Sequence, residues 1–176
     1  MINTKLAPYL SGIVLTVLFS TSMHLHAATK EQAVKAGVVY NITKFVVWPS
    51  HASDKFNLCV FGDDKLDGGL EALYGKRVGN KKIVLRRNLP DKALAECQVA
   101  FIAKQDDEGI QNILAKFKKL PVLTISDNAD FINHGGMVGL VRDNRRVGFE
   151  FDLTAVRSVG LNVGAQLLKL AKRVKE

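Results

Sequence analysis

The stretch FNLCVFGDD, residues 56–64, decides the fold of this chain. Phe56, Leu58 and Val60 alternate with a second set that is also mostly apolar, which predicts a strand covered on both faces, as in a parallel sheet. The Gly-Asp-Asp that follows is typical of a turn, and leucines at 66, 70 and 73 recur at helical spacing after it. A strand, a turn and a helix in this order predict an α/β domain.

The remaining periodic segments extend this unit in both directions. Thr29 and Gln32 predict a capping box at the start of an amphipathic helix that runs until Pro49. Further strands are expected at 83–85, 99–103 and 122–125, a helix at 110–117, a hairpin of 137–141 with 145–151, and a last helix over 163–174. The prediction is a single three-layer α/β domain with a mixed sheet, parallel in its first part and closed by a C-terminal antiparallel hairpin.

Residues 1–27 have the pattern of an export signal. Lys5 gives a positive start, residues 9–19 form a short apolar run, and Ala27 supplies the small residue that a signal peptidase needs. We therefore expect a signal peptide at 1–27 and a mature domain at 28–176, outside the cytoplasm; an uncleaved anchor is the alternative. The length of the mature part suits one hydrophobic core.

The chain carries 25 basic and 17 acidic side chains, a formal charge of +8 that becomes +7 without Lys5. Such an excess of basic side chains in a cytosolic protein would suggest that it binds nucleic acid, but an exported protein does not meet that partner. The charge instead suits anionic lipid headgroups, an acidic protein surface or an anionic ligand. The alternative is that the lysines only keep a small domain soluble.

Cys59 and Cys97 are the only two cysteines. An even pair in an oxidising compartment predicts a disulfide, and both positions lie in or beside expected strands. Two buried free thiols are the alternative. The spacing is not Cys-x-x-Cys, so the sequence gives no support to a thiol–disulfide oxidoreductase.

The stock of catalytic residues is small. The mature part keeps His51 and His134, and neither belongs to a His-Glu-x-x-His, Gly-x-Ser-x-Gly or Walker pattern. Asp63 and Asp64 follow the end of an expected strand, a position where α/β sheets often bind ligands and where a cation could bind. Acidic residues at such a position more often cap the next helix. We expect no enzyme, no cofactor and no metal.

Several segments together resemble the YfiR-like periplasmic proteins. They are YNxxKFxxWP at 40–49, FxLCVxGDD at 56–64, Gly135-Gly136-Met137, VxFE at 147–150, Gly160-Leu161 and QLLKLA at 166–171. The resemblance implies a periplasmic repressor that binds the periplasmic part of an inner-membrane diguanylate cyclase and lowers cyclic-di-GMP signalling and biofilm formation. It also implies that an outer-membrane lipoprotein can sequester the repressor. Known members carry a second disulfide near the hairpin, and this chain has no cysteine there.

Four residues are candidates for contact with a partner or a ligand: Lys44, Trp48, Glu150 and Arg157. Trp48 ends the first helix and either meets a partner or packs inward. Glu150 interrupts an apolar strand and either contacts Arg157 or a basic ligand, or is a surface or structurally paired acid. The leading interpretation is a protein–protein repressor that forms a homodimer; the alternative is a periplasmic small-ligand sensor that signals to another membrane receptor.

Overall fold

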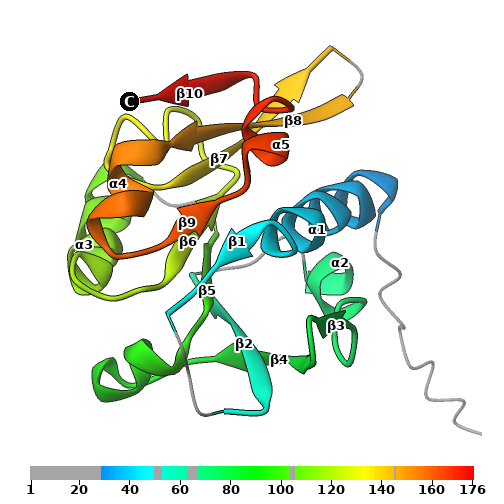
Figure 1. The fold of residues 1–176 in the computed structure, drawn as a ribbon, viewed down its shortest axis with the longest axis vertical. Helices are drawn as coiled ribbons and strands as arrows, with labels where there is room; N and C mark the ends of the chain where they lie inside the picture. Colours follow the sequence, from blue (N-terminus) through cyan, green and yellow to red (C-terminus); the bar gives the residue numbers. More distant parts are fainter. Residues whose placement is uncertain (1–28, 50–52, 63–66, 104–105, 145) are drawn as a thin grey trace, which may run out of the picture.

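The computed structural model describes residues 29–49, 53–62, 67–103, 106–144 and 146–176. Its centre is an eight-stranded mixed sheet with helices packed on it, so the predicted fold class is confirmed (Figure 1). The helices are α1 (Lys30–Thr43), α2 (Asp67–Glu71), the 3-10 helix η1 (Asp91–Glu96), α3 (Asp107–Phe117), α4 (Leu153–Ser158) and α5 (Ala165–Leu168). The strands are β1 (Val46–Val47), β2 (Lys55–Phe61), β3 (Arg77–Val78), β4 (Lys81–Arg87), β5 (Val99–Ile102), β6 (Leu123–Ser126), β7 (Val138–Asp143), β8 (Arg146–Asp152), β9 (Asn162–Val163) and β10 (Arg173–Lys175).

The strand order of the large sheet is β10-β8-β7-β6-β5-β2-β4-β3. The five strands from β4 to β7 are parallel, because the chain returns to the same end of the sheet through each connection. The β7–β8 hairpin and the β3–β4 hairpin are antiparallel, and β10 lies parallel to β8 at the far edge. A separate two-stranded sheet joins β1 to β9.

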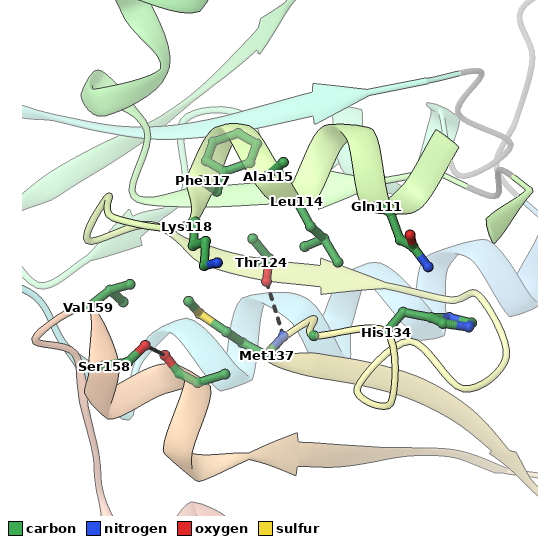
Figure 2. A pocket seen from close by; sticks show the side chains of 12 residues that line it. Gln111, Leu114, Ala115, Phe117, Lys118, Thr124, His134, Met137, Ser158 and Val159 are labelled. Carbon is green, nitrogen blue, oxygen red and sulfur yellow. Dashed lines mark hydrogen bonds between the residues drawn. The ribbon is translucent and has the colours of Figure 1, made fainter. Parts of the chain in front are cut away.

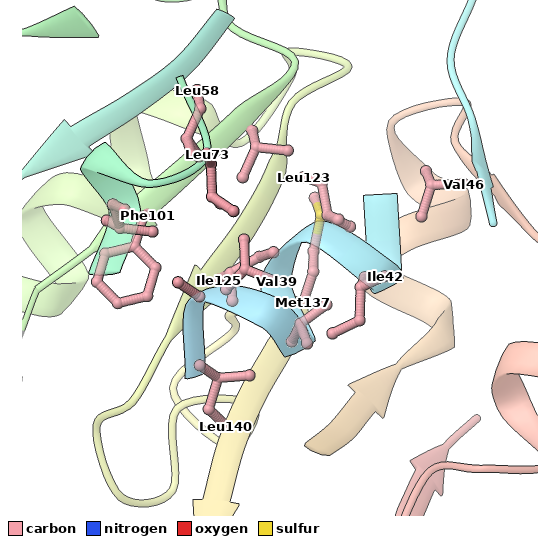
Figure 3. Close-up of a cluster of buried hydrophobic side chains, with 14 of the residues drawn as sticks. Val39, Ile42, Val46, Leu58, Leu73, Phe101, Leu123, Ile125, Met137 and Leu140 are labelled. Carbon is pink, nitrogen blue, oxygen red and sulfur yellow. The ribbon is translucent and has the colours of Figure 1, made fainter. Parts of the chain in front are cut away.

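The sheet buries both faces, as the apolar stretch 56–61 predicts. On one face, Leu58, Phe101 and Ile125 pack against Val39 and Ile42 of α1 in the largest core cluster (Figure 3). On the opposite face, Phe117 of α3 packs on Ala100 and the sulfur atoms of Cys59 and Cys97. Helices therefore cover the sheet on both sides.

The predicted disulfide is present. Cys59 of β2 and Cys97, just before β5, are fully buried and bonded, with their Cα atoms 5.9 Å apart. Because β2 pairs with β5, the bond ties two neighbouring strands at the centre of the sheet.

The first helix starts where the sequence predicts and ends earlier. Thr29 and Gln32 form the capping box. The prediction that the helix runs to Pro49 is wrong: it ends at Thr43, and Val46–Val47 instead pair with β9. The buried side of α1 consists of Ala36, Val39, Ile42 and Thr43, whereas Val34 is exposed.

The predicted helix over 163–174 is also wrong. A single helical turn, α5, occupies the middle of this segment, and Arg173–Lys175 form the edge strand β10. The backbone N–H of Lys172 donates to the carbonyl of Phe149, and Arg173 lies opposite Glu150. The backbone of residues 172–175 therefore hydrogen-bonds to the otherwise open edge of β8. The helical spacing of the apolar residues gave no sign of this strand pairing.

Within the described segments, no helix is long and apolar enough to cross a membrane. The proposed signal at 1–27 and the residues His51, Asp63 and Asp64 lie outside the described residues.

Candidate functional site

A cleft of about 480 Å³ brings two of the predicted site residues together. We call it the Trp48 cleft. It lies where the end of α1 and strand β1 pass the amino-terminal ends of β2 and β5. Its lining residues are Thr43, Lys44, Val46, Trp48, Pro49, Phe56, Val78, Gly79, Asn80, Lys81 and Gln98.

Trp48 forms one wall of this cleft and is held on two sides. Its indole Nε1 donates a hydrogen bond to the carbonyl of Gln98 at 2.9 Å, and its ring meets Phe56 edge-on with the centroids 5.1 Å apart. The side chain is half-buried: it packs on Phe56 and also lines the cleft. Contact of Trp48 with a partner stays a prediction.

Lys44 places a cation beside this wall. Its ammonium lies 4.1 Å from the centre of the Tyr40 ring and 3.0 Å from the amide oxygen of Asn41. The Tyr40 hydroxyl in turn donates to the backbone carbonyl of Arg77. The described lining contains Lys44 and Lys81 and no acidic residue, so the cleft has a positive field suited to an anionic group.

Strand β1 also presents apolar side chains outside the lining of the cleft, because alternate residues of a strand point to opposite faces. Val47 is 63% exposed and Phe45 is 37% exposed. Within the described part of the chain, β1 pairs with β9 only, so its second edge carries backbone groups that another chain could meet. An apolar strip next to cations is the composition expected of a protein-docking surface.

Arg157 lies in a neighbouring segment. It is exposed in the last turn of α4, and no side-chain ion pair or hydrogen bond reaches it from the described residues. The turn that follows α4 contacts the Trp48 end of β1, since a Cβ on Gly160 would lie 4.0 Å from Pro49.

Glu150 lies elsewhere, at the β10 edge of the sheet. Its carboxylate pairs with Arg173 at 2.7 Å, and the hydrogen bond raises the pKa of Arg173. The partner of Glu150 is therefore Arg173 and not Arg157. The structure brings Lys44 and Trp48 together in the cleft, and neither Arg157 nor Glu150 belongs to its lining.

A second cavity, of about 390 Å³, lies between α3 and α4 (Figure 2). His134 stands at one end of it, and its buried Nδ1 atom has no hydrogen-bond partner among the described residues. The nearest carboxylate oxygen, from Asp107, is 3.8 Å from Nε2. Sequence reasoning counted His134 only as a possible catalyst and could not place it in a cavity, because its neighbours come from helices far away in the chain.

The two sites offer few groups for metal binding or catalysis among the described residues. No group of three or more His, Cys, Asp or Glu side chains within the described segments could hold a metal ion. The contacts that the sites offer are aromatic faces, lysine ammonium groups, backbone amides and apolar surface. These features suit binding to another molecule.

The fold and its clefts define an α/β binding domain with a mixed, mostly parallel sheet. The chain matches the family model described as YfiR/HmsC-like over residues 32–172, and it therefore belongs to that family. The match covers α1, the Trp48 cleft and the sheet as far as Lys172.

Comparison with solved structures supports the fold through one of them. A conserved domain protein from Vibrio cholerae O1 biovar El Tor str. N16961 superposes with a TM-score of 0.54 at 9% sequence identity, covering 82% of this chain and 60% of that one. The chain thus spans about 60% of the length of that structure. The ABC domain from Streptococcus pneumonia, solved in complex with L-Trp, gives a TM-score of 0.46 at 8% identity and covers 68% of this chain and 55% of that one.

Proposed function

We propose that this protein is a periplasmic repressor that binds the periplasmic part of an inner-membrane diguanylate cyclase and lowers cyclic-di-GMP synthesis and biofilm formation. The observation that carries the proposal is the family match over residues 32–172. Residues 1–27 serve as the export signal and residues 28–176 form the working domain. An outer-membrane lipoprotein sequesters the repressor in this scheme, and the active form is a homodimer.

The docking surface we assign to this role is the Trp48 cleft together with β1. Val47 offers exposed apolar area, Trp48 offers a fixed aromatic wall, and Lys44 offers a charge that can orient a partner. Apolar and aromatic groups at the centre of an interface supply most of the binding energy, while the charges steer the encounter.

The test is coexpression of the exported protein with each inner-membrane diguanylate cyclase of its host that has a periplasmic part. We expect cellular cyclic-di-GMP to fall, and purified repressor to bind the purified periplasmic part of the cyclase. Val47→Asp places a charge in the docking surface and should weaken that binding at least about tenfold, the loss typical of an interface hot spot. Leu170→Asp is the matched control, because Leu170 is equally exposed at 69% but lies in the segment between α5 and β10.

Unchanged cyclic-di-GMP with correctly exported protein would remove the proposal. Equal effects of the Val47 and Leu170 variants would remove the assignment of the docking surface while leaving the repressor role in place.

The Trp48 cleft also supports a second candidate function, a periplasmic sensor for a small ligand. A volume of about 480 Å³ with an aromatic wall and two lysines can hold a small anionic or aromatic molecule. A thermal-shift screen of amino acids, nucleotides and vitamins tests this idea, since a ligand of the native state must raise the melting temperature. Absence of any shift at saturating concentrations would reject it.

A further inference from the structure

Three cations form a row across three neighbouring strands at the β3 edge of the sheet. Lys55 of β2 lies directly opposite Lys82 of β4, and Lys82 lies directly opposite Arg77 of β3. Neighbouring strands are about 4.8 Å apart, so residues in register lie side by side on one face. We call these three residues the basic row.

The row lies on the face of the sheet away from α1. Ile83, the next residue along β4, points the other way and belongs to the core cluster packed under α1. Lys55, Arg77 and Lys82 are all exposed and line a cleft of about 470 Å³ with Tyr74. Tyr74 is 67% exposed, among the most exposed large apolar side chains in the described segments.

The charges of the basic row are not paired within the described part of the chain. Its side chains form no ion pair with a described carboxylate, although Asp54 lines the same cleft, and the Arg77 guanidinium donates to the backbone carbonyl of Asn80. The next cations along β4 differ in this respect, since Arg86 pairs with Glu96 and Arg87 pairs with Glu71. Like charges directly opposite each other destabilise a sheet, so the row carries a cost that an external anion would remove.

We propose that the basic row and Tyr74 form a contact surface for the phosphate groups of an anionic phospholipid bilayer. The three exposed cations lie side by side on one face of β2, β4 and β3, so a flat anionic surface can meet all of them at once. An exposed aromatic beside basic residues is the combination found where proteins meet the headgroup layer. The basic row adjoins the Trp48 cleft, since Asn80 lines both clefts, but it includes neither Val47 nor any other residue of β1. The presence of a cyclase at this bilayer rests on the proposed function.

The test measures partition of the purified mature protein onto vesicles. Phosphatidylcholine vesicles should bind little protein, and vesicles with about one third phosphatidylglycerol should bind it in a salt-sensitive way. Arg77→Gln with Lys82→Gln should reduce the partition coefficient roughly 25-fold, because each basic residue near an anionic membrane contributes a factor of about five. Lys119→Gln with Lys169→Gln is the matched control, since both lysines are exposed elsewhere and the net charge changes equally.

Three results would overturn the inference. They are no binding of the wild type to anionic vesicles, equal loss in both double variants, and unchanged partition in the row variant. A row variant that keeps vesicle binding but loses the cyclase would identify the row as a protein-docking surface instead. Binding of the cyclase fragment, measured separately without lipid, distinguishes failure of this inference from failure of the proposed function.

Discussion

At the scale of single residues, Cys59 and Cys97 make the clearest prediction. The bond closes a loop with a sequence separation of 38, and restricting the unfolded chain in this way stabilises the folded state by about 4 kcal/mol in the chain-entropy model. Replacing both cysteines with alanine should therefore remove a large fraction of the free energy of unfolding. Urea unfolding of the variant, compared with the wild type in the presence and absence of reductant, measures the loss. Equal unfolding midpoints for all three samples would contradict the expectation.

Gly135 and Gly136 illustrate two different reasons for a glycine. Gly135 has φ = +95°, whereas a Cβ on Gly136 would lie 2.2 Å from the ring of the buried Phe131. Gly136→Ala should cost roughly 1–3 kcal/mol or more because the ring must shift within a packed core. Gly135→Ala has open space and should cost about 1–2 kcal/mol through its backbone angle alone. Urea unfolding of both variants measures the two losses in free energy of unfolding. A larger loss for Gly135→Ala than for Gly136→Ala would contradict the expectation.

Residue patterns predicted part of the candidate site. Lys44 and Trp48 come from one short stretch, so their closeness follows from the chain itself. The Glu150–Arg173 pair was missed because it depends on a strand pairing that the sequence does not display. The sequence shows that residues 76–87 contain lysines and arginines and no acidic residue. Their alignment with Lys55 in one row follows only from the register of three strands.

At the scale of elements, α1 is held to the sheet by charges at its first turns. Glu31 pairs with Arg142 of β7 at 2.8 Å, and Lys35 pairs with Asp127, which follows β6, at the same distance. Hydrogen bonds from Arg142 and Lys35 lower the pKa of Glu31 below its ordinary value of 4.5. Burial opposes the charge of Lys35, but Asp127 and Glu31 outweigh it and raise the pKa of that lysine.

The lowered pKa of Glu31 fixes the direction of a pH effect. The unfolded chain binds a proton at Glu31 at a higher pH than the folded chain does, so the contribution is present above pH 4.5 and is lost as the pH falls through the folded pKa. Glu31→Gln should therefore flatten the acid limb of a plot of unfolding midpoint against pH. Glu108→Gln, at an exposed acid without an ion pair to the described residues, is the control and should leave the limb unchanged. Parallel acid limbs for the wild type and the Glu31 variant would refute the role of this pair.

Six of the eight strands of the large sheet were predicted, whereas β3 and the C-terminal strand β10 were not. The strands β2, β5 and β6 are buried runs bounded by turns, which gives a strong local signal. The segment 163–174 has apolar residues at helical spacing, but its strand depends on β8, which lies more than twenty residues away. Tertiary hydrogen bonding decides such an edge, so local periodicity misassigns it.

At the scale of the whole molecule, the exposed part of the proposed docking surface lies apart from the residues that stabilise the fold. The disulfide and the large core join β2, β5 and α1, whereas the exposed side chain of Val47 lies in the small β1–β9 sheet outside the large sheet. A substitution at Val47 changes an exposed side chain and should leave the free energy of unfolding within about 0.5 kcal/mol of the wild type.

This separation predicts two distinguishable ways to lose repression. Cells that coexpress the cyclase with the cysteine-free variant should regain cyclic-di-GMP because less folded repressor survives, and immunoblots of the periplasmic fraction should show the loss. The Val47→Asp variant should restore cyclic-di-GMP at a normal level of repressor, because it removes contact and leaves the fold intact. Growth at lower temperature should partly rescue the cysteine-free variant and should not rescue the Val47 variant. Normal amounts of a cysteine-free repressor that nevertheless fails to repress would contradict this explanation, since the disulfide would then act on the partner directly.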